Sequence, residues 1–173
     1  MDDNKKNPPS KFDYDRYTNI AFHRRGAIIN ETIMLERLID DFIVNYFCTD
    51  AKKKVELMEL IIGTKRMIFE NKVQVFKVLL DKHFPEILEK NKTLITDIVN
   101  IVIPARNVFA HYWLVTNEEM GEMATEGITQ FVKFNNSTEY IHYSHAEFQR
   151  IMMTISDCIK IVNPLLTPRA SLS

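Results

Sequence analysis

The sequence predicts a mostly α-helical fold with one small β-hairpin before the last helix. Only four of the 173 residues are glycine, and this scarcity favours long helices over many-turned sheets. Over several long stretches, hydrophobic residues recur at three- and four-residue spacing, which is the period of a helix with one buried face. One short region alternates between apolar and polar residues instead, as strands do.

The length and composition are those of one globular domain, with 46% hydrophobic and 26% charged residues. We expect a loose polar lead-in over residues 1–11, a single helical domain over residues 12–166 and a short tail over residues 167–173. Cys48 and Cys158 lie far apart without metal-ligand spacing, so we expect buried free thiols, no metal and no cofactor. No long apolar run or apolar leader is present, and we therefore expect a cytoplasmic protein with no membrane partner.

The first helix is predicted from about Asp13 to Phe47. Its apolar face carries Ile28, Leu35, Leu38, Ile39, Phe42 and Tyr46. Arg24 and Glu31 fall on the same face, where a charge is usually paired or functional unless it reaches solvent at the edge. We expect Arg24 to reach solvent in this way and Glu31 to be the better candidate for a supporting role in a functional site.

Two helices are predicted in the middle of the chain. One runs from Val55 to Ile62 and is closed by Gly63, because glycine commonly stops a helix. The other runs from Met67 to Phe84 and ends before Pro85. Lys72 lies close to its apolar face, where we expect the long side chain to reach solvent, although it could also support a charged pocket.

A further helical pattern starts near Thr93 and continues to Tyr112. Pro104 interrupts it, because proline lacks a backbone N–H and its ring crowds the preceding turn. Either the helix kinks at Pro104 or a new helix begins there. In the second case the free N–H groups of the new helix would suit a phosphate.

An acidic connection over residues 117–127 separates this helix from the predicted hairpin. Its negative charges would repel a phosphate backbone if the connection lay beside a nucleic-acid-binding site. Residues 128–134 and 138–143 alternate and are rich in β-branched and aromatic residues, and they predict a β-hairpin over about 128–143.

The last helix is predicted from Ala146 to Val162. Ser144 and Glu147 have the spacing of a capping box, in which each residue bonds the backbone N–H of the other. His142 and His145 are three residues apart, but they lie across a strand end and a helix cap with no evident third ligand, so we do not interpret them as a metal site.

Arg106, Asn107 and His111 are polar residues inside an otherwise apolar segment. On an ideal helix Asn107 and His111 share a face, whereas Arg106 and His111 lie about 140° apart. Arg106 and His111 would then converge only if the helix is distorted or if two copies of the segment meet across a two-fold axis. The residue types suit phosphodiester cleavage without a metal, since histidine can move protons and arginine can hold the charge on phosphate. The alternative is a structural polar pocket in which the asparagine and histidine bond each other.

The segment from Arg106 to His111 resembles the signature of the HEPN superfamily of helical domains, and its Arg-Asn-x-Phe-Ala-His form is similar to mannitol-repressor-like members. A looser resemblance extends over about Phe22 to Trp113. The resemblance implies an up-and-down helical bundle, a homodimer and, in many members, metal-independent endoribonuclease activity. It implies that Arg106 stabilises phosphate, that Asn107 is its polar companion and that His111 transfers protons. Pro104 and the hairpin are departures from the simple bundle.

Two functions follow as expectations. The first is a dimeric RNase that acts on RNA in a toxin–antitoxin or defence setting, with an antitoxin or regulatory protein as a further partner. The second is a non-catalytic regulator of transcription or signalling that uses the same groove to bind a protein, a nucleotide or nucleic acid. The intact Arg106, Asn107 and His111 favour the first. The net charge of −1, which argues against a broad basic face, favours the second.

Overall fold

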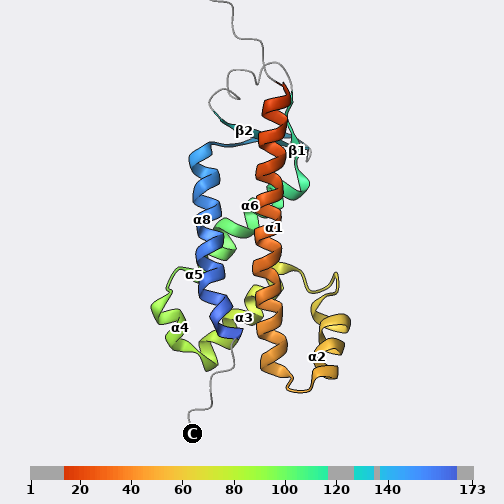
Figure 1. Cartoon of the computed structure of the whole chain (residues 1–173), viewed down its shortest axis with the longest axis vertical. Helices are drawn as coiled ribbons and strands as arrows, with labels where there is room; N and C mark the ends of the chain where they lie inside the picture. Colours follow the sequence, from red (N-terminus) through yellow and green to blue (C-terminus); the bar gives the residue numbers. More distant parts are fainter. Residues whose placement is uncertain (1–13, 117–126, 135–136, 167–173) are drawn as a thin grey trace, which may run out of the picture.

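The computed structural model describes residues 14–116, 127–134 and 137–166, and its fold is mostly α-helical, as predicted (Figure 1). The expected lead-in and tail, and nearly all of the acidic connection, lie outside the described residues. None of the described helices combines the length and the apolar character needed to cross a membrane.

Helix α1, Tyr14–Phe47, is the longest element. It packs against α2 (Ala51–Leu57), α3 (Phe69–His83), α6 (Ile103–His111) and α8 (His145–Val162). Its buried positions Ile28, Leu35 and Ile39 recur at the three- and four-residue spacing that the sequence predicted. The main partners of α1 are α8 and α6. Helices α1 and α8 run side by side in the same direction, with their N-terminal ends at the same end of the molecule (Figure 1).

The second helical unit consists of α2, Ala51–Leu57, and a π-helical turn, Met58–Ile62. Asp50 caps α2, because its Oδ1 accepts a 3.0 Å hydrogen bond from the backbone N–H of Lys53. Gly63 ends the unit as predicted, and its N–H donates to the carbonyl of Met58. A Cβ at this position would lie 2.9 Å from that carbonyl oxygen, so only glycine closes the turn without displacement.

Helix α3, Phe69–His83, packs on α1, and α4, Pro85–Lys90, follows directly. The sequence predicted α3 and its end at the proline, but it did not predict α4. Pro85 is the first residue of α4, a position at which the missing N–H has no cost.

The helical segment that leads to His111 has three consecutive parts: α5, Leu94–Asp97, a π-helical turn, Ile98–Val102, and α6. Pro104 lies in the first turn of α6, immediately after the π-helical turn. The wider turn changes the hydrogen-bond pattern just where proline lacks a donor. The helical backbone thus continues through Pro104 from the π-helical turn, and the disturbed hydrogen-bond ladder that the sequence predicted is present there.

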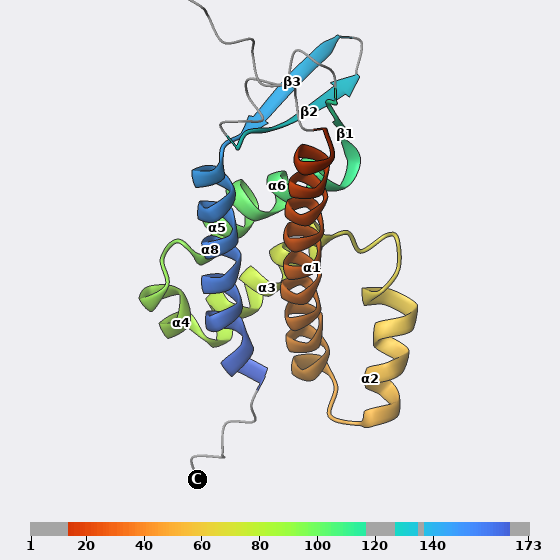
Figure 2. The same cartoon turned by 45° about the horizontal axis from the view of Figure 1, so that its top comes forward.

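A three-stranded antiparallel sheet with the order β1-β2-β3 lies across the end of the helical bundle at which α1 and α8 begin (Figure 2). Strands β2, Thr129–Phe134, and β3, Thr138–Tyr143, form the predicted hairpin. The sequence did not predict β1, Trp113–Leu114, which pairs Trp113 with Val132. The predicted capping box then starts α8, where Ser144 Oγ accepts from the N–H of Glu147 at 3.2 Å.

One hydrophobic core joins the helices to the sheet. Its fully buried aromatic residues are Phe76, Phe109 and Phe131, which lie on α3, α6 and β2. The ring centres of Phe109 and Phe131 are 4.7 Å apart in an edge-to-face arrangement. This contact anchors the sheet on α6, two residues before His111.

Candidate functional site

The end of α6 brings together the side chains of Arg106, Asn107 and His111. Nη1 of Arg106 donates to Oδ1 of Asn107 at 3.1 Å and lies 3.5 Å from Nε2 of His111. Helix α6 is regular from Ile103 to His111, so the backbone itself does not rotate Arg106 toward His111. The length of the arginine side chain closes the gap, and one chain is therefore sufficient for this contact.

The contact between Arg106 and His111 is compatible with only one tautomer of the neutral His111 ring. A guanidinium has only donors, so the Nε2 atom of His111 must offer a lone pair to Arg106, and the proton of the neutral ring then lies on Nδ1. His111 is exposed and Arg106 and Asn107 are half-buried. The site thus presents a proton acceptor at the surface with a fixed cation behind it.

A small cleft of about 170 Å³ adjoins the cation. Its polar lining comes from Arg106 and Asn107 on α6 and from Glu70 on α3, and Ile68, Phe69 and Ile103 form its apolar wall. Glu70 was not singled out from the sequence. Glu70 is an acidic residue in the first turn of α3. Acidic residues are common at this position of any helix because they complement the helix dipole, so Glu70 did not stand out in the sequence.

Lys72 does not reach solvent, and the expectation that it would do so is wrong. Its side chain is 6% exposed, and its Nζ lies 2.7 Å from Glu36 Oε1 and 2.8 Å from Asp40 Oδ2, both on α1. These two ion pairs raise the pKa of Lys72 although burial opposes the charge. Lys72 therefore ties α3 to α1, and its charge is already paired.

Glu31 is half-buried and forms no hydrogen bond or ion pair with any residue that the structure describes. Its supporting role thus stays a prediction. Of the two supporting candidates, Lys72 is a structural residue in the described fold, and neither contacts the Arg106 guanidinium through a hydrogen bond among the described residues.

Arg24 was expected to reach solvent, and this expectation is also wrong. The residue is 5% exposed, and its Nη1 donates to the carbonyl of Gly127 at 2.7 Å and to Thr129 Oγ1 at 2.8 Å. Both acceptors lie more than 100 residues further along the chain. No local pattern could have shown them.

The motif helix runs directly into an exposed aromatic surface. Trp113 of β1 is 72% exposed and Phe134 of β2 is 67% exposed, with their ring centres 6.4 Å apart. Lys133 Nζ lies 5.4 Å from the ring centre of Tyr112, which directly follows His111. The backbone carbonyl of Tyr112 accepts a 2.7 Å hydrogen bond from Arg25, which holds this turn against α1.

His142 on β3 and His145 at the start of α8 have separate partners. His142 Nε2 lies 3.3 Å from the side-chain nitrogen of Gln130, and His145 Nδ1 lies 3.2 Å from Nη2 of Arg24. Within the described ranges, no three His, Cys, Asp or Glu side chains are placed to hold a metal ion together. Cys48 and Cys158 are free thiols, and burial raises the pKa of Cys158 to about 12.

Comparison with known proteins provides no relative from which a role could be transferred, because no family model, curated protein or solved structure matches the chain significantly.

Proposed function

We propose that this protein is a metal-independent endoribonuclease in which Arg106, Asn107 and His111 form the reacting site. The observation that carries the proposal is the arrangement of one guanidinium within 3.1 Å of an amide oxygen and 3.5 Å of an exposed imidazole nitrogen. Among the described residues Arg106 forms no ion pair, so its charge is available to an incoming phosphate.

The chemistry needs only groups that RNA and these side chains supply. When RNA binds, Nε2 of His111 exchanges its contact with Arg106 for a ribose 2′-hydroxyl and accepts the hydroxyl proton. The 2′-oxygen then attacks the adjacent phosphorus. The bond from phosphorus to the 5′-oxygen breaks, which leaves a 2′,3′-cyclic phosphate and a 5′-hydroxyl. Arg106 holds the charge that develops on the phosphate oxygens, and Asn107 fixes the guanidinium through its amide oxygen.

A homodimer completes this scheme. The departing 5′-oxygen needs a proton. The His111 that acts as the base faces the attacking 2′-oxygen, on the opposite side of the phosphorus from the leaving oxygen, so the donor must be a second, protonated group. We assign this step to His111 of a second copy, brought into the same groove by a two-fold axis. The exposed apolar residue Ile68, 52% exposed beside the cleft, is a surface that a second copy would cover.

The aromatic residues after the motif support single-stranded RNA as the substrate. Exposed rings such as Trp113 and Phe134 offer flat surfaces on which unpaired bases stack, at about 1–3 kcal/mol per base. Trp113 follows His111 by only two residues, and its ring pairs with that of Phe134.

The test is cleavage of a mixed-sequence RNA by the full chain in excess EDTA, with analysis of the product ends. We compare the wild type with His111→Ala, Arg106→Ala and the matched control His83→Ala, which removes an exposed histidine at the end of α3. Loss of proton transfer is expected to reduce the rate of His111→Ala by a factor of about 100 or more, while the control retains wild-type activity.

Cyclic phosphate ends that form in EDTA and disappear in His111→Ala are the expected result. Cleavage by His111→Ala at the wild-type rate would exclude the proposed role of His111. If the folded wild type cleaves no RNA, the non-catalytic regulator becomes the better explanation of the same site.

A further inference from the structure

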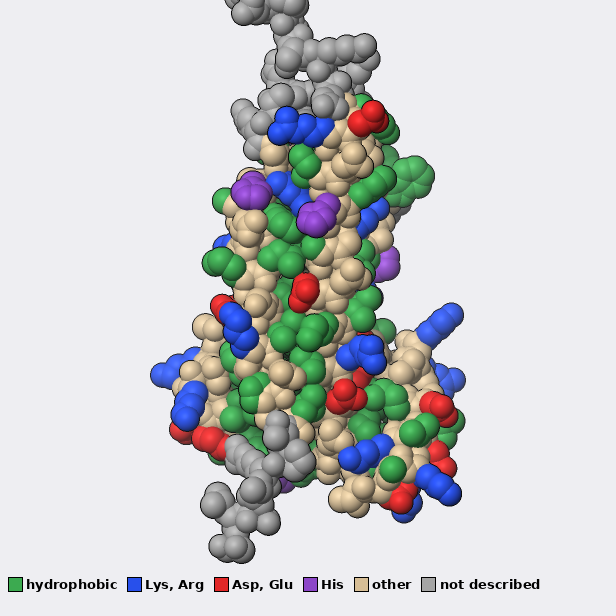
Figure 3. Space-filling view, viewed as in Figure 1, with side chains coloured by type: hydrophobic (Ala, Val, Ile, Leu, Met, Phe, Trp, Pro, Cys, Tyr) green, Lys and Arg blue, Asp and Glu red, His purple; other side chains and the backbone are tan. Residues whose placement is uncertain are grey.

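A second pocket, larger than the cleft at Arg106, lies where the N-terminal halves of α1 and α8 approach the sheet. Its volume is about 580 Å³, within the range of small-molecule sites. Residues of α1 and α8 and Gly127 line it, and none of them lines the cleft at Arg106. Figure 3 shows hydrophobic side chains along the seam between α1 and α8, with basic and histidine side chains gathered toward the sheet.

Arg24 is the charged group of this pocket, and its partners in the described part of the chain are all uncharged acceptors. They are the Gly127 carbonyl, the Thr129 hydroxyl and Nδ1 of His145, at 2.7, 2.8 and 3.2 Å. No described carboxylate forms an ion pair with Arg24. A buried guanidinium without a counter-charge is costly, which favours an anion as its missing partner.

The hydrogen bonds of Arg24 leave donors for such an anion. Two hydrogens of Nη1 serve Gly127 and Thr129, and one of Nη2 faces His145. The second Nη2 hydrogen and the Nε hydrogen have no acceptor among the described residues, and a guanidinium can present such a pair to the two oxygens of one carboxylate. Because Arg24 only donates, Nδ1 of His145 must accept, which leaves the ring proton on Nε2 as a third donor.

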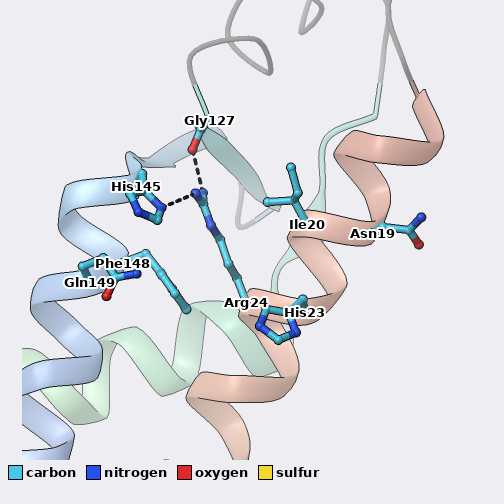
Figure 4. A pocket seen from close by; sticks show the side chains of 8 residues that line it. All are labelled: Asn19, Ile20, His23, Arg24, Gly127, His145, Phe148 and Gln149. Carbon is cyan, nitrogen blue, oxygen red and sulfur yellow. Dashed lines mark hydrogen bonds between the residues drawn. The ribbon is translucent and has the colours of Figure 1, made fainter.

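The side chains that line the pocket indicate the chemical character of the uncharged part of the ligand. Phe148 and Ile20 stand on opposite sides of the Arg24 side chain, whose guanidinium reaches the end closed by Gly127 and His145, while His23 lies at the other end (Figure 4). The Arg24 Cζ atom lies 5.3 Å from the centre of the Phe148 ring. Apolar side chains thus flank the cation on both sides, which suits a ligand whose anionic head meets Arg24 and whose apolar body lies along these side chains.

We propose that this pocket binds a small aromatic carboxylate, with its carboxylate on Arg24 and His145 and its ring against Phe148 and Ile20. A carboxylate is favoured over a phosphate monoester, because one guanidinium balances one negative charge and a phosphate monoester carries nearly two. The proposal is independent of RNA cleavage, since no residue is shared with the site at Arg106.

Calorimetric titration of the full chain tests the proposal with three probes. Indole-3-acetate is the aromatic carboxylate, indole-3-ethanol is its uncharged counterpart, and adenosine monophosphate carries the phosphate head. We expect saturable binding of indole-3-acetate. The affinities of the other two probes should be lower by a factor of about ten or more. Equal binding of the uncharged probe, preference for the phosphate, or no binding of indole-3-acetate would each overturn the proposal.

Variants locate the site. Arg24→Met is expected to weaken indole-3-acetate binding about tenfold or more, and the neighbouring Arg25→Met, which loses a half-buried arginine outside the pocket, should bind like the wild type. His145→Leu removes a donor at the exposed start of α8 and is expected to weaken binding about threefold or more, which keeps the test decisive if Arg24→Met does not fold. Unchanged affinity in His145→Leu and in folded Arg24→Met would contradict the proposal.

Discussion

Lys72, Glu36 and Asp40 form a buried ionic cluster between α3 and α1, and Asp40 is its least satisfied member. Oδ2 of Asp40 accepts from Lys72 at 2.8 Å, whereas Oδ1 is buried and has no hydrogen-bond partner in the described structure. Burial is the main cause that raises the pKa of Asp40 to about 6, and the hydrogen bond from Lys72 opposes it. Two carboxylates thus compete for one ammonium group.

The raised pKa of Asp40 predicts a pH dependence of stability. Between about pH 4 and pH 6 the folded state holds the proton of Asp40 while the unfolded chain releases it, so the folded state loses stability as the pH rises through this window. The free energy of unfolding of the wild type should fall by on the order of 2 kcal/mol relative to Asp40→Asn between pH 4 and pH 7.

Urea unfolding of both proteins at several pH values provides the measurement. Asp81→Asn, which changes an exposed carboxylate of α3, is the matched control and should follow the wild-type profile. If Asp40→Asn and the wild type show parallel profiles, Asp40 does not titrate in this window.

The elements begin and end where local chemistry permits. Gly63 closes its helical unit through a backbone bond to Met58, Pro85 opens α4, and Pro104 follows a π-helical turn that accommodates its missing donor. The same turn ends four residues before Arg106. The position of α6 therefore depends on an irregularity that Pro104 indicates in the sequence.

The capping box at the start of α8 predicts a measurable contribution to stability. Ser144 Oγ accepts from the backbone of Glu147, and the backbone N–H of Ser144 donates to Glu147 Oε2 at 2.8 Å. These bonds from Ser144 lower the pKa of Glu147. Ser144→Ala should lower the free energy of unfolding by about 1 kcal/mol, because it leaves an N–H at the helix start unsatisfied.

Thermal or urea unfolding measures this effect. Ser137→Ala serves as the control, because Ser137 is an exposed serine between the two hairpin strands. An equal effect of the two substitutions would show that the hydroxyl of Ser144 contributes no specific cap.

For the whole molecule, the proposed mechanism requires two copies of the chain to assemble before RNA is cleaved. The contact between Arg106 and His111 forms within one chain, so a dimer is not needed to join them. It is needed only for the second proton transfer in the proposed mechanism. The role of the second copy can therefore be tested separately from the role of the motif.

Mixing wild-type and variant chains tests the role of the second copy separately from the role of the motif. When a tenfold excess of His111→Ala is allowed to exchange subunits with the wild type, about one in eleven wild-type chains stays paired with another wild-type chain. We expect RNA cleavage per wild-type chain to fall about tenfold. The same mixture assayed before exchange is the control and should retain full activity.

Light scattering during size-exclusion chromatography gives the oligomeric state directly. A particle of twice the 20.3 kDa chain mass is expected. A strictly monomeric protein with full cleavage activity would exclude the composite site while leaving the one-chain contact of Arg106 and His111 in place.

The mostly α-helical class, most helix ends, the hairpin and the capping box could be predicted from the sequence alone, and the segment from Arg106 to His111 could be singled out as a candidate site. These features depend on hydrophobic periodicity and on hydrogen bonds between residues a few positions apart, and both can be read along the chain. The strand β1 and the helix α4 were missed, because each is too short to show a period.

The environment of Arg24 and Lys72, by contrast, depends on tertiary packing and could not be predicted from the sequence. Arg24 and Lys72 look like residues at a helix edge until the chain folds, when segments 103 and 32 residues away supply the acceptors Gly127 and Asp40. The proximity of Arg106 to His111 is a comparable case, since it depends on the path of a long side chain rather than on helix phase. Burial and pairing are properties of surfaces brought together by packing, and a single helical pattern contains no information about the surface that will cover it.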